Sequence, residues 1–244
     1  MIAKDRLIFP LDVPSSQEAC RLVTLLGEHV GVFKVGLELF ISEGPPIVDS
    51  IADLTDAEIF LDLKFHDIPA TVQRAIRSGS CLRRADFVTA HCDPKLLEVV
   101  VNEVSGTVKV LAVTVLTSLD TDALTSLGIR GELAREPVQL VIHRSAIAKK
   151  AGCNGVVCSG HEAEAVKKRF RDDLIVVTPG IRPDWSVVRK DDQRRIVTPY
   201  QALKSGADYI VVGRPISGAP DPVEAAARVV AEIERGLRDR NRGE

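Results

Sequence analysis

Residues 59–68 read Ile-Phe-Leu-Asp-Leu-Lys-Phe-His-Asp-Ile, an apolar run that carries charges at every second position near its end. Side chains in a β-strand alternate between two faces, so Asp62 and Lys64 share one face while Leu61 and Leu63 share the other. This stretch predicts a strand whose leucines pack against covering helices and whose two charges point to the opposite side.

Short apolar runs of this kind recur along the whole chain, and each is followed by a helix-like stretch. The runs cover residues 7–12, 32–36, 59–64, 87–91, 108–116, 155–159, 174–179 and 209–213. Their average spacing of about thirty residues is the length of one βα unit. They are nearly continuous in apolar residues, as is typical of parallel strands that are covered by helices.

Cap signals precede several of the intervening helices. They are Ser15-Ser16 before 17–29, Thr198-Pro199 before a helix that ends near Gly206, and Asp221-Pro222 before 223–237. The last ten residues, RGLRDRNRGE, are interpreted as a charged, frayed helix end. Eight strand-then-helix units with no linker predict that residues 1–244 form one domain, a single (β/α)₈ TIM barrel. A doubly wound open sheet is the structural alternative.

Composition narrows the classes of function. The 244 residues include 32 basic and 34 acidic side chains, and this balance argues against a general nucleic-acid-binding surface. No apolar run approaches the ~18 residues that a membrane helix needs. Pro10 and Asp12 come too early for a signal peptide. Five scattered cysteines, an odd number, argue against a disulfide framework. We therefore expect a cytoplasmic protein that binds neither membrane nor nucleic acid.

Polar side chains occur where the predicted strands end, which is where TIM barrels carry their chemistry. They are Asp12, Lys34, Asp62 with Lys64, His91, Thr117 with Ser118, Arg182 and Arg214. Any one of them could simply mark the end of a strand.

Lys34, Asp62, Lys64 and Asp67 are predicted to lie together as an array of alternating charge. Four such charges in one place are harder to explain as mere strand ends. A buried structural salt-bridge network is the alternative, but buried charges seldom add net stability because desolvation offsets their attraction. Flanking carboxylates favour the ammonium form of Lys64, whereas a Schiff-base lysine needs a neutral amine. Lys64 is therefore expected to act as a general acid or an anion stabiliser. The two ammonium groups would compete with a divalent cation for the carboxylates, so no metal is expected.

A second group of residues suits a phosphate. Residues 211–215, Val-Val-Gly-Arg-Pro, end the eighth run at Gly213, where the backbone can approach an anion, and Arg214 adds a bidentate donor. Pro179 and Arg182 belong to a similar turn after the seventh run, and loops at these two places often bind phosphate in this fold. Gln193 lies in the long polar loop between Arg182 and Thr198, which is predicted to be a lid. Ordinary turn glycines and surface arginines are the alternative.

Other motifs are weak or absent from the sequence. There is no glycine-rich dinucleotide loop, Walker loop, H-E-x-x-H or C-x-x-C motif. We interpret His66, His91 and His143 as structural residues rather than as a metal-binding trio.

Six blocks of sequence together resemble the orotidine 5′-phosphate decarboxylase family. They are FKVGLELF, LDLKFHDIPATV, VLTSL, TPGIRP, DDQRRIVTP and VVGRPI, in the family's order and over nearly the whole chain. The resemblance implies a homodimeric (β/α)₈ barrel that converts orotidine monophosphate to uridine monophosphate with no cofactor or metal. This reaction is the last step of pyrimidine nucleotide synthesis.

The resemblance also implies roles for individual residues. Lys64 would protonate C6 of the pyrimidine and Asp62 would lie against the substrate carboxylate, while Lys34 and Asp67 complete the charged array, with Asp67 contributed across the dimer interface. The ribose would contact Asp12 and Lys34, together with Thr71 of the partner subunit, and the base would contact Thr117 and Ser118. The phosphate would contact Gln193, Gly213 and Arg214, with Arg182 on the loop beside it. Ile68 and Pro179 lie in the matching motifs and are also expected to bind the substrate. Two positions depart from the family pattern: Ala70 stands where the family often has asparagine, and Trp185 lies early in the predicted lid.

Two other functions remain open from the sequence alone. Magnesium-dependent sugar-phosphate decarboxylases or synthases share the D-x-K-x-x-D motif that Asp62, Lys64 and Asp67 form here. These enzymes usually carry one more acidic metal ligand, and Glu38, four residues after Lys34, is a candidate for it. A nucleotide-binding barrel without catalytic activity is the other possibility, against which the intact set of charges argues.

Overall fold

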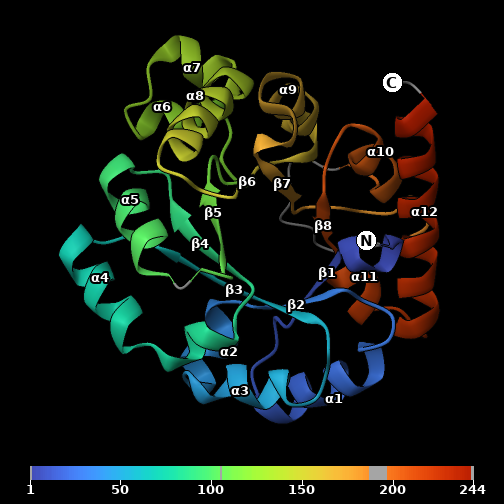
Figure 1. The fold of residues 1–244 in the computed structure, drawn as a ribbon. Helices are drawn as coiled ribbons and strands as arrows, with labels where there is room; N and C mark the ends of the chain where they lie inside the picture. The colour runs from blue at the N-terminus through green and yellow to red at the C-terminus, as the bar shows by residue number, and fades with distance from the viewer. Residues whose placement is uncertain (1, 105, 187–196, 243–244) are drawn as a thin grey trace.

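The computed structural model, which describes residues 2–104, 106–186 and 197–242, contains a closed barrel of parallel strands (Figure 1). Each strand pairs with its neighbours in chain order, and β8 pairs with β1. The strands are β1 (Leu7–Pro10), β2 (Val32–Val35), β3 (Glu58–Phe65), β4 (Phe87–His91), β5 (Lys109–Val113), β6 (Gly155–Val157), β7 (Ile175–Thr178) and β8 (Tyr209–Val211). Every predicted run overlaps one of these strands, and the closed barrel confirms the predicted (β/α)₈ TIM barrel.

Helices surround the strands in chain order, from α1 in blue to α12 in red (Figure 1). They are α1 (Ser16–Leu26), α2 (Leu37–Glu43), α3 (Pro46–Ala52), α4 (Pro69–Ser78), α5 (Pro94–Glu103), α6 (Thr121–Ser126), α7 (Gly131–Arg135), α8 (Pro137–Lys150), α9 (Gly160–Phe170), α10 (Pro199–Lys204), α11 (Arg214–Ser217) and α12 (Pro222–Arg242), with the 3₁₀ helices η1 (Ala3–Arg6), η2 (Ser80–Arg84) and η3 (Arg171–Asp173). Within the described part of the chain, no helix is both long and apolar enough to cross a membrane.

Predicted helix starts are confirmed where a side chain caps the first turn. The Ser15 hydroxyl accepts a hydrogen bond from the backbone N–H of Glu18 at 3.4 Å, at the start of α1. At α10, Thr198 accepts from the Gln201 N–H at 3.2 Å, and the Gln201 side chain accepts from the Thr198 N–H at 3.1 Å. This reciprocal pair is a capping box, which satisfies two N–H groups that the helix itself cannot pair.

The prediction of a frayed C-terminal end is wrong for residues 235–242, which continue α12. The Tyr200 hydroxyl of α10 donates a hydrogen bond to the Asp239 carboxylate at 2.9 Å. The guanidinium of Arg235 lies 4.3 Å from the centre of the Tyr200 ring. These contacts tie the charged end of α12 to α10, so it is held by tertiary structure rather than left in solvent.

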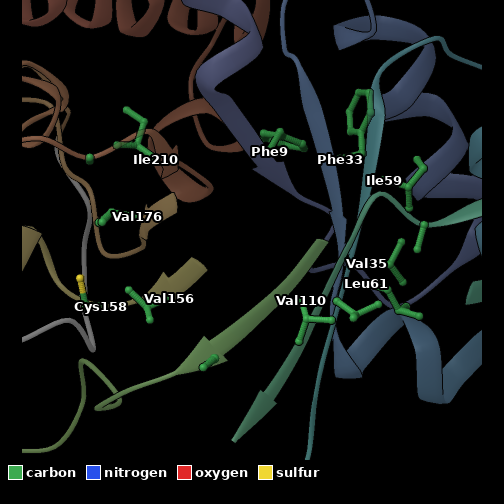
Figure 2. Packing of buried hydrophobic residues seen from close by; sticks show 14 of the residues in the cluster. Phe9, Phe33, Val35, Ile59, Leu61, Val110, Val156, Cys158, Val176 and Ile210 are labelled. Carbon is green, nitrogen blue, oxygen red and sulfur yellow. The ribbon is translucent and has the colours of Figure 1, made fainter. Parts of the chain in front are cut away.

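Two hydrophobic layers form because side chains alternate across each strand. The outward layer packs the barrel against the helices, and Figure 2 shows part of it, including Phe9 and Phe33, whose rings meet edge to face at 6.3 Å. The inward layer fills the barrel axis with Ile8, Val32, Phe60, Phe87, Leu111, Val177 and Tyr209. Lys34 and Asp62 lie two residues after Val32 and Phe60, so their side chains are on the same inward face, next to this apolar layer on its carboxyl-terminal side.

Candidate active site

A cavity of about 500 Å³ opens above the inward layer, at the carboxyl ends of the strands. It is within the range of small-molecule sites. Among the described residues, its lining contains four basic and two acidic side chains. These lining residues are Pro10, Asp12, Lys34, Phe60, Asp62, Lys64, Val113, Val115, Leu116, Thr117, Val157, Cys158, Val177, Pro179, Gly180, Arg182, Val211, Gly213 and Arg214. The excess of positive charge suits an anionic ligand.

Four of these side chains form a continuous chain of alternating charge. Lys34 Nζ lies 3.2 Å from Asp12 Oδ1 and 3.6 Å from Asp62 Oδ2. Lys64 Nζ lies 2.8 Å from the same Asp62 Oδ2. The side chains of Lys34 and Asp62 are about 11% and 12% exposed, whereas that of Lys64 is 31% exposed. Of the two lysines, Lys64 is therefore the one whose ammonium group a bound ligand can reach more easily.

The carboxylate of Asp62 stays ionised despite its burial. Burial by itself raises the pKa of Asp62, but the charges of Lys34 and Lys64 and hydrogen bonds from Lys64 and Thr89 together lower that pKa below its usual value of 3.8. A fixed negative charge thus lies beside the reachable ammonium group at neutral pH.

The backbone around Lys64 does not follow simple strand alternation. Pairing between β3 and β4 shifts register between Leu61 and Phe65, which marks a bulge. Lys64 itself has φ of 50°, in the left-handed region that non-glycine residues seldom adopt. Its side chain reaches Asp62, as predicted, but through this irregular backbone rather than through the regular period of two. Strained backbone of this kind is common at functional sites.

Thr89 of β4 supports this irregular segment. Its hydroxyl donates a hydrogen bond to Asp62 Oδ1 at 2.8 Å and accepts one from the Lys64 N–H at 3.0 Å. Thr89 was not among the residues predicted from the sequence, although its position as a polar residue inside the apolar run 87–90 was a signal that could have found it.

Gly36 lies against the Asp12–Lys34 ion pair. A Cβ at Gly36 would lie 3.0 Å from Lys34 Nζ and 3.3 Å from Asp12 Oδ1, which is tighter than ordinary contact. Gly36, which connects β2 to α2, therefore leaves room for the ion pair between Asp12 and Lys34.

The other side of the cavity carries the predicted phosphate-binding residues. Gly213 and Arg214 follow β8, while Pro179 and Arg182 follow β7, and all four line the cavity. A Cβ at Gly213 would lie 2.8 Å from the Pro10 ring, so the absence of a side chain lets β8 approach β1 closely here. The structure thus brings Lys34, Asp62 and Lys64 of the predicted charged array to the same cavity as these four residues.

Both ends of the predicted lid are attached to the barrel. Ile181 and Val197 form a parallel bridge, and the Arg182 N–H donates to the Val197 carbonyl at 3.0 Å. Trp185 Nε1 donates to Glu232 of α12 at 2.8 Å, and Arg228 lies 4.1 Å from the Trp185 ring centre. Residues 187–196, including Gln193, lie outside the described residues, so the assignment of Gln193 to the phosphate remains a prediction.

Of the predicted substrate-binding residues that the structure describes, four do not line the cavity of their own chain: Asp67, Ile68, Thr71 and Ser118. Asp67 and Ser118 are exposed, as is Ile68, at 65%. Within one chain, therefore, Asp12 rather than Asp67 completes the alternating array with Lys34, Asp62 and Lys64.

The histidines beside the cavity do not resemble a metal site. The rings of His66 and His91 lie 4.6 Å apart. Burial lowers the pKa of His91, and the neighbouring His66, Lys64 and Arg144 lower it further. Within residues 2–104, 106–186 and 197–242, no three histidine, cysteine or carboxylate side chains are placed to hold a metal ion.

Known proteins are similar to this chain in sequence and in fold. The model of the Orotidine 5′-phosphate decarboxylase / HUMPS family matches residues 5–229. A relative from Desulfosudis oleivorans, named orotidine 5′-phosphate decarboxylase, is 47% identical and covers 96% of this chain and 95% of its own. A relative of the same name from Syntrophomonas wolfei is 45% identical and covers 96% of this chain and its own full length.

Solved structures agree with these sequence relatives. The crystal structure of orotidine 5′-phosphate decarboxylase from Lactobacillus acidophilus superimposes with a TM-score of 0.76 at 31% identity, and the match covers 93% of this chain and 98% of that one. With the family model matching most of the sequence, the chain belongs to the orotidine 5′-phosphate decarboxylase / HUMPS family.

Proposed function

We propose that this chain decarboxylates orotidine 5′-monophosphate to uridine 5′-monophosphate and CO₂, the last step of pyrimidine nucleotide synthesis. The observation that carries the proposal is the chain of charges Asp12–Lys34–Asp62–Lys64 in a cavity that also holds Arg182 and Arg214. Relatives named for this activity match nearly the whole chain.

The charges fit the chemical difficulty of this reaction. Loss of CO₂ from C6 of the pyrimidine leaves a carbanion with no adjacent electron sink, so stabilisation has to be electrostatic. Lys64 supplies a fixed cation next to that carbon and then donates its proton to C6 as general acid. Asp62 lies against the substrate carboxylate and disfavours it in the ground state, so its departure relieves a repulsion.

The remaining residues bind the parts of the substrate that do not react. Asp12 and Lys34 bind the ribose hydroxyls, and Thr117 contacts the base from the segment that follows β5. The phosphate is bound by Gly213 and Arg214, with Arg182, Pro179 and Gln193 on the loop after β7. Binding energy from the phosphate offsets the cost of placing a carboxylate beside Asp62. No metal or cofactor takes part in the proposed reaction.

The proposal includes a homodimer with shared sites, in which Asp67, Ile68, Thr71 and Ser118 complete the contacts to substrate. The first three of these come from the partner subunit. Supporting this, Ile68, after β3, is 65% exposed, and Leu37 and Ile41 of α2, which follows the adjacent strand β2, are 53% and 79% exposed. Apolar side chains exposed around one end of a barrel are typical of a surface that a protein partner covers.

We also propose that residues 1–244 act as one catalytic domain in the cytoplasm. The strands of the barrel are drawn from Leu7 through Val211, and α12 packs against α10 and η1. All five cysteines are free thiols, which suits a reducing compartment.

An ultraviolet absorbance assay of orotidine monophosphate, run with and without EDTA, tests the proposed function. We expect turnover that EDTA does not change. Absence of turnover would contradict the proposal, and turnover that EDTA abolishes would favour the magnesium-dependent sugar-phosphate branch instead. Glu38, the candidate ligand for that branch, lies on α2 and does not line the cavity.

A further inference from the structure

Thr89 lies behind the charged residues rather than among them. It is in the middle of β4, its exposed fraction is 0%, and it does not line the cavity. Its neighbours on the inward face of the barrel, such as Phe87 and Leu111, are apolar. Valine has nearly the same shape as threonine and would fill this position, so packing alone does not account for a hydroxyl here.

The hydroxyl joins the two central residues of the site. It has one proton to donate and two lone pairs to accept with. Its proton goes to Asp62 Oδ1 at 2.8 Å, since an ionised carboxylate can only accept, and it accepts the Lys64 N–H at 3.0 Å. The other oxygen of Asp62 contacts Lys64 Nζ at 2.8 Å. Asp62 and Lys64 are thus linked twice, once directly and once through Thr89.

The second link acts on the backbone of Lys64. This residue adopts φ of 50° inside the bulge of β3, where regular pairing with β4 is interrupted between Leu61 and Phe65. A backbone N–H that leaves the ladder needs another acceptor, and Thr89 Oγ1 provides it. Because φ of Lys64 sets the direction in which its side chain leaves the backbone, this hydrogen bond also contributes to the placement of Nζ beside Asp62.

We infer that Thr89 is a positioning residue for the decarboxylation, whose hydroxyl holds the Asp62 carboxylate and the Lys64 backbone in one fixed geometry. The inference rests on the proposed function and assigns to β4 a residue that never touches the substrate. Catalysis of this type depends on charges that are placed before the reaction begins, so loss of the hydroxyl should affect the chemical step more than binding.

Two variants separate the hydroxyl from the rest of the side chain. Thr89→Val removes the hydroxyl and keeps the volume, and Thr89→Ser keeps the hydroxyl and loses a methyl group. We expect Thr89→Val to lower kcat by about 10- to 100-fold, the range for one hydrogen bond to a charged group. KM should change by less than about threefold, because the ribose and phosphate contacts are intact. Thr89→Ser should keep kcat within about threefold of the unchanged protein.

The pH profile gives a readout that a purely structural role would not move. Asp62 is faced by Lys34, Lys64 and Thr89, and loss of the Thr89 donor should raise the pKa of its carboxyl. The acidic limb of kcat should therefore shift to higher pH in Thr89→Val and stay in place in Thr89→Ser. Equal loss of kcat in both variants, or an unchanged kcat and profile in Thr89→Val, would overturn the inference.

A measurement on the resting protein keeps this test separate from the proposed function. Carboxyl ¹³C NMR of aspartate-labelled protein, with Asp62→Asn to assign the signal, follows the titration of Asp62 directly. We expect a higher pKa for Asp62 in Thr89→Val than in Thr89→Ser or the unchanged protein. If the unchanged protein fails to turn over orotidine monophosphate, the proposed function fails, and the role of Thr89 in decarboxylation falls with it. If turnover is present and Asp62 titrates identically in all three proteins, only the inference about Thr89 is overturned.

Discussion

Asp62 contacts more of the site than any other single residue described above. Two ammonium groups and one hydroxyl contact its carboxylate, and all three contacts favour its charged form. Their combined effect exceeds the cost of burial, which is why the pKa of Asp62 is lowered. A pKa that is lower in the folded than in the unfolded protein makes the free energy of unfolding depend on pH.

Asp62→Asn provides a test of that linkage. The charge of Asp62 contributes stability that is fully present above its unfolded pKa, near 3.8, and is lost as the pH falls through the lower folded value. The difference in unfolding free energy between the unchanged protein and Asp62→Asn should therefore be constant near neutral pH and decline below about pH 3.8. Urea unfolding followed by circular dichroism at a series of pH values measures this difference.

Asp53→Asn is the matched control, because it removes a carboxylate that is 69% exposed and paired with Arg84 at 2.7 Å. Exposed pairs contribute little to stability, so its difference from the unchanged protein should vary much less with pH. A difference for Asp62→Asn that stays flat down to the acid transition would contradict the lowered pKa.

The sequence allowed part of this residue-level arrangement to be predicted. Lys34, Asp62 and Lys64 come at the ends of adjacent parallel strands, and such ends meet at one rim of a barrel. The left-handed backbone of Lys64 could not be predicted, since it depends on the register between β3 and β4. Thr89 was missed for a related reason: one threonine in a strand is common, and only the folded structure shows what its hydroxyl contacts.

At the scale of elements, the turn between β2 and α2 places Gly36 against the ion pair between Asp12 and Lys34. Gly36→Ala should push Lys34 Nζ and Asp12 Oδ1 away from their present positions, since the new Cβ would lie 3.0 and 3.3 Å from them. Both residues are proposed to bind the ribose, so KM for orotidine monophosphate should rise by about tenfold or more. Steady-state kinetics measure this change, and a melting curve reports whether the fold is retained.

Gly131→Ala serves as the control for this substitution. The nearest atom that its Cβ would meet is Nη2 of Arg135, at 3.6 Å, which is ordinary contact, and Gly131 does not line the cavity. It should leave KM unchanged. Equal KM values for Gly36→Ala and the unchanged protein would show that crowding at this turn does not govern the ribose contacts.

Local signals predicted the beginnings of elements better than their ends. Thr198 and Pro199 predicted the start of α10 because a cap is made by neighbouring residues. The end of α12 was predicted wrongly because its contacts with Tyr200 join segments about forty residues apart, as the separation of Tyr200 and Asp239 shows. Charge composition alone could not reveal that partner.

For the whole molecule, eight repeats of one βα unit predicted the barrel from the spacing of apolar runs, without any single decisive motif. The oligomer is different, because nothing in the spacing of residues shows what lies across an interface. Asp67, Ile68 and Thr71 are absent from the cavity of their own chain, as the proposed shared site requires.

Mixed dimers test the shared site. In a dimer of one Lys64→Ala chain and one Asp67→Ala chain, one site lacks both residues and the other has Lys64 from one chain and Asp67 from its partner. Random subunit exchange should therefore restore about a quarter of the activity of the unchanged protein, while each variant alone remains inactive. Two different affinity tags allow the mixed dimer to be isolated and assayed. A mixed dimer with no activity, once its composition is shown by mass spectrometry, would place Asp67 outside its partner's site.

The central claim is that Lys64 stabilises the carbanion and protonates it, and its most direct test is turnover of orotidine monophosphate by Lys64→Ala. Lys109→Ala is the matched control, since Lys109 has a similar exposure, 30% against 31%, and also forms an ion pair of 2.8 Å, with Glu58 at the opposite end of the barrel. We predict a loss of at least about 10⁴-fold in kcat for Lys64→Ala, the combined effect of a general acid and a preorganised charge, with kcat of Lys109→Ala nearly unchanged. A folded Lys64→Ala protein that keeps kcat within about tenfold of the unchanged protein would contradict the claim.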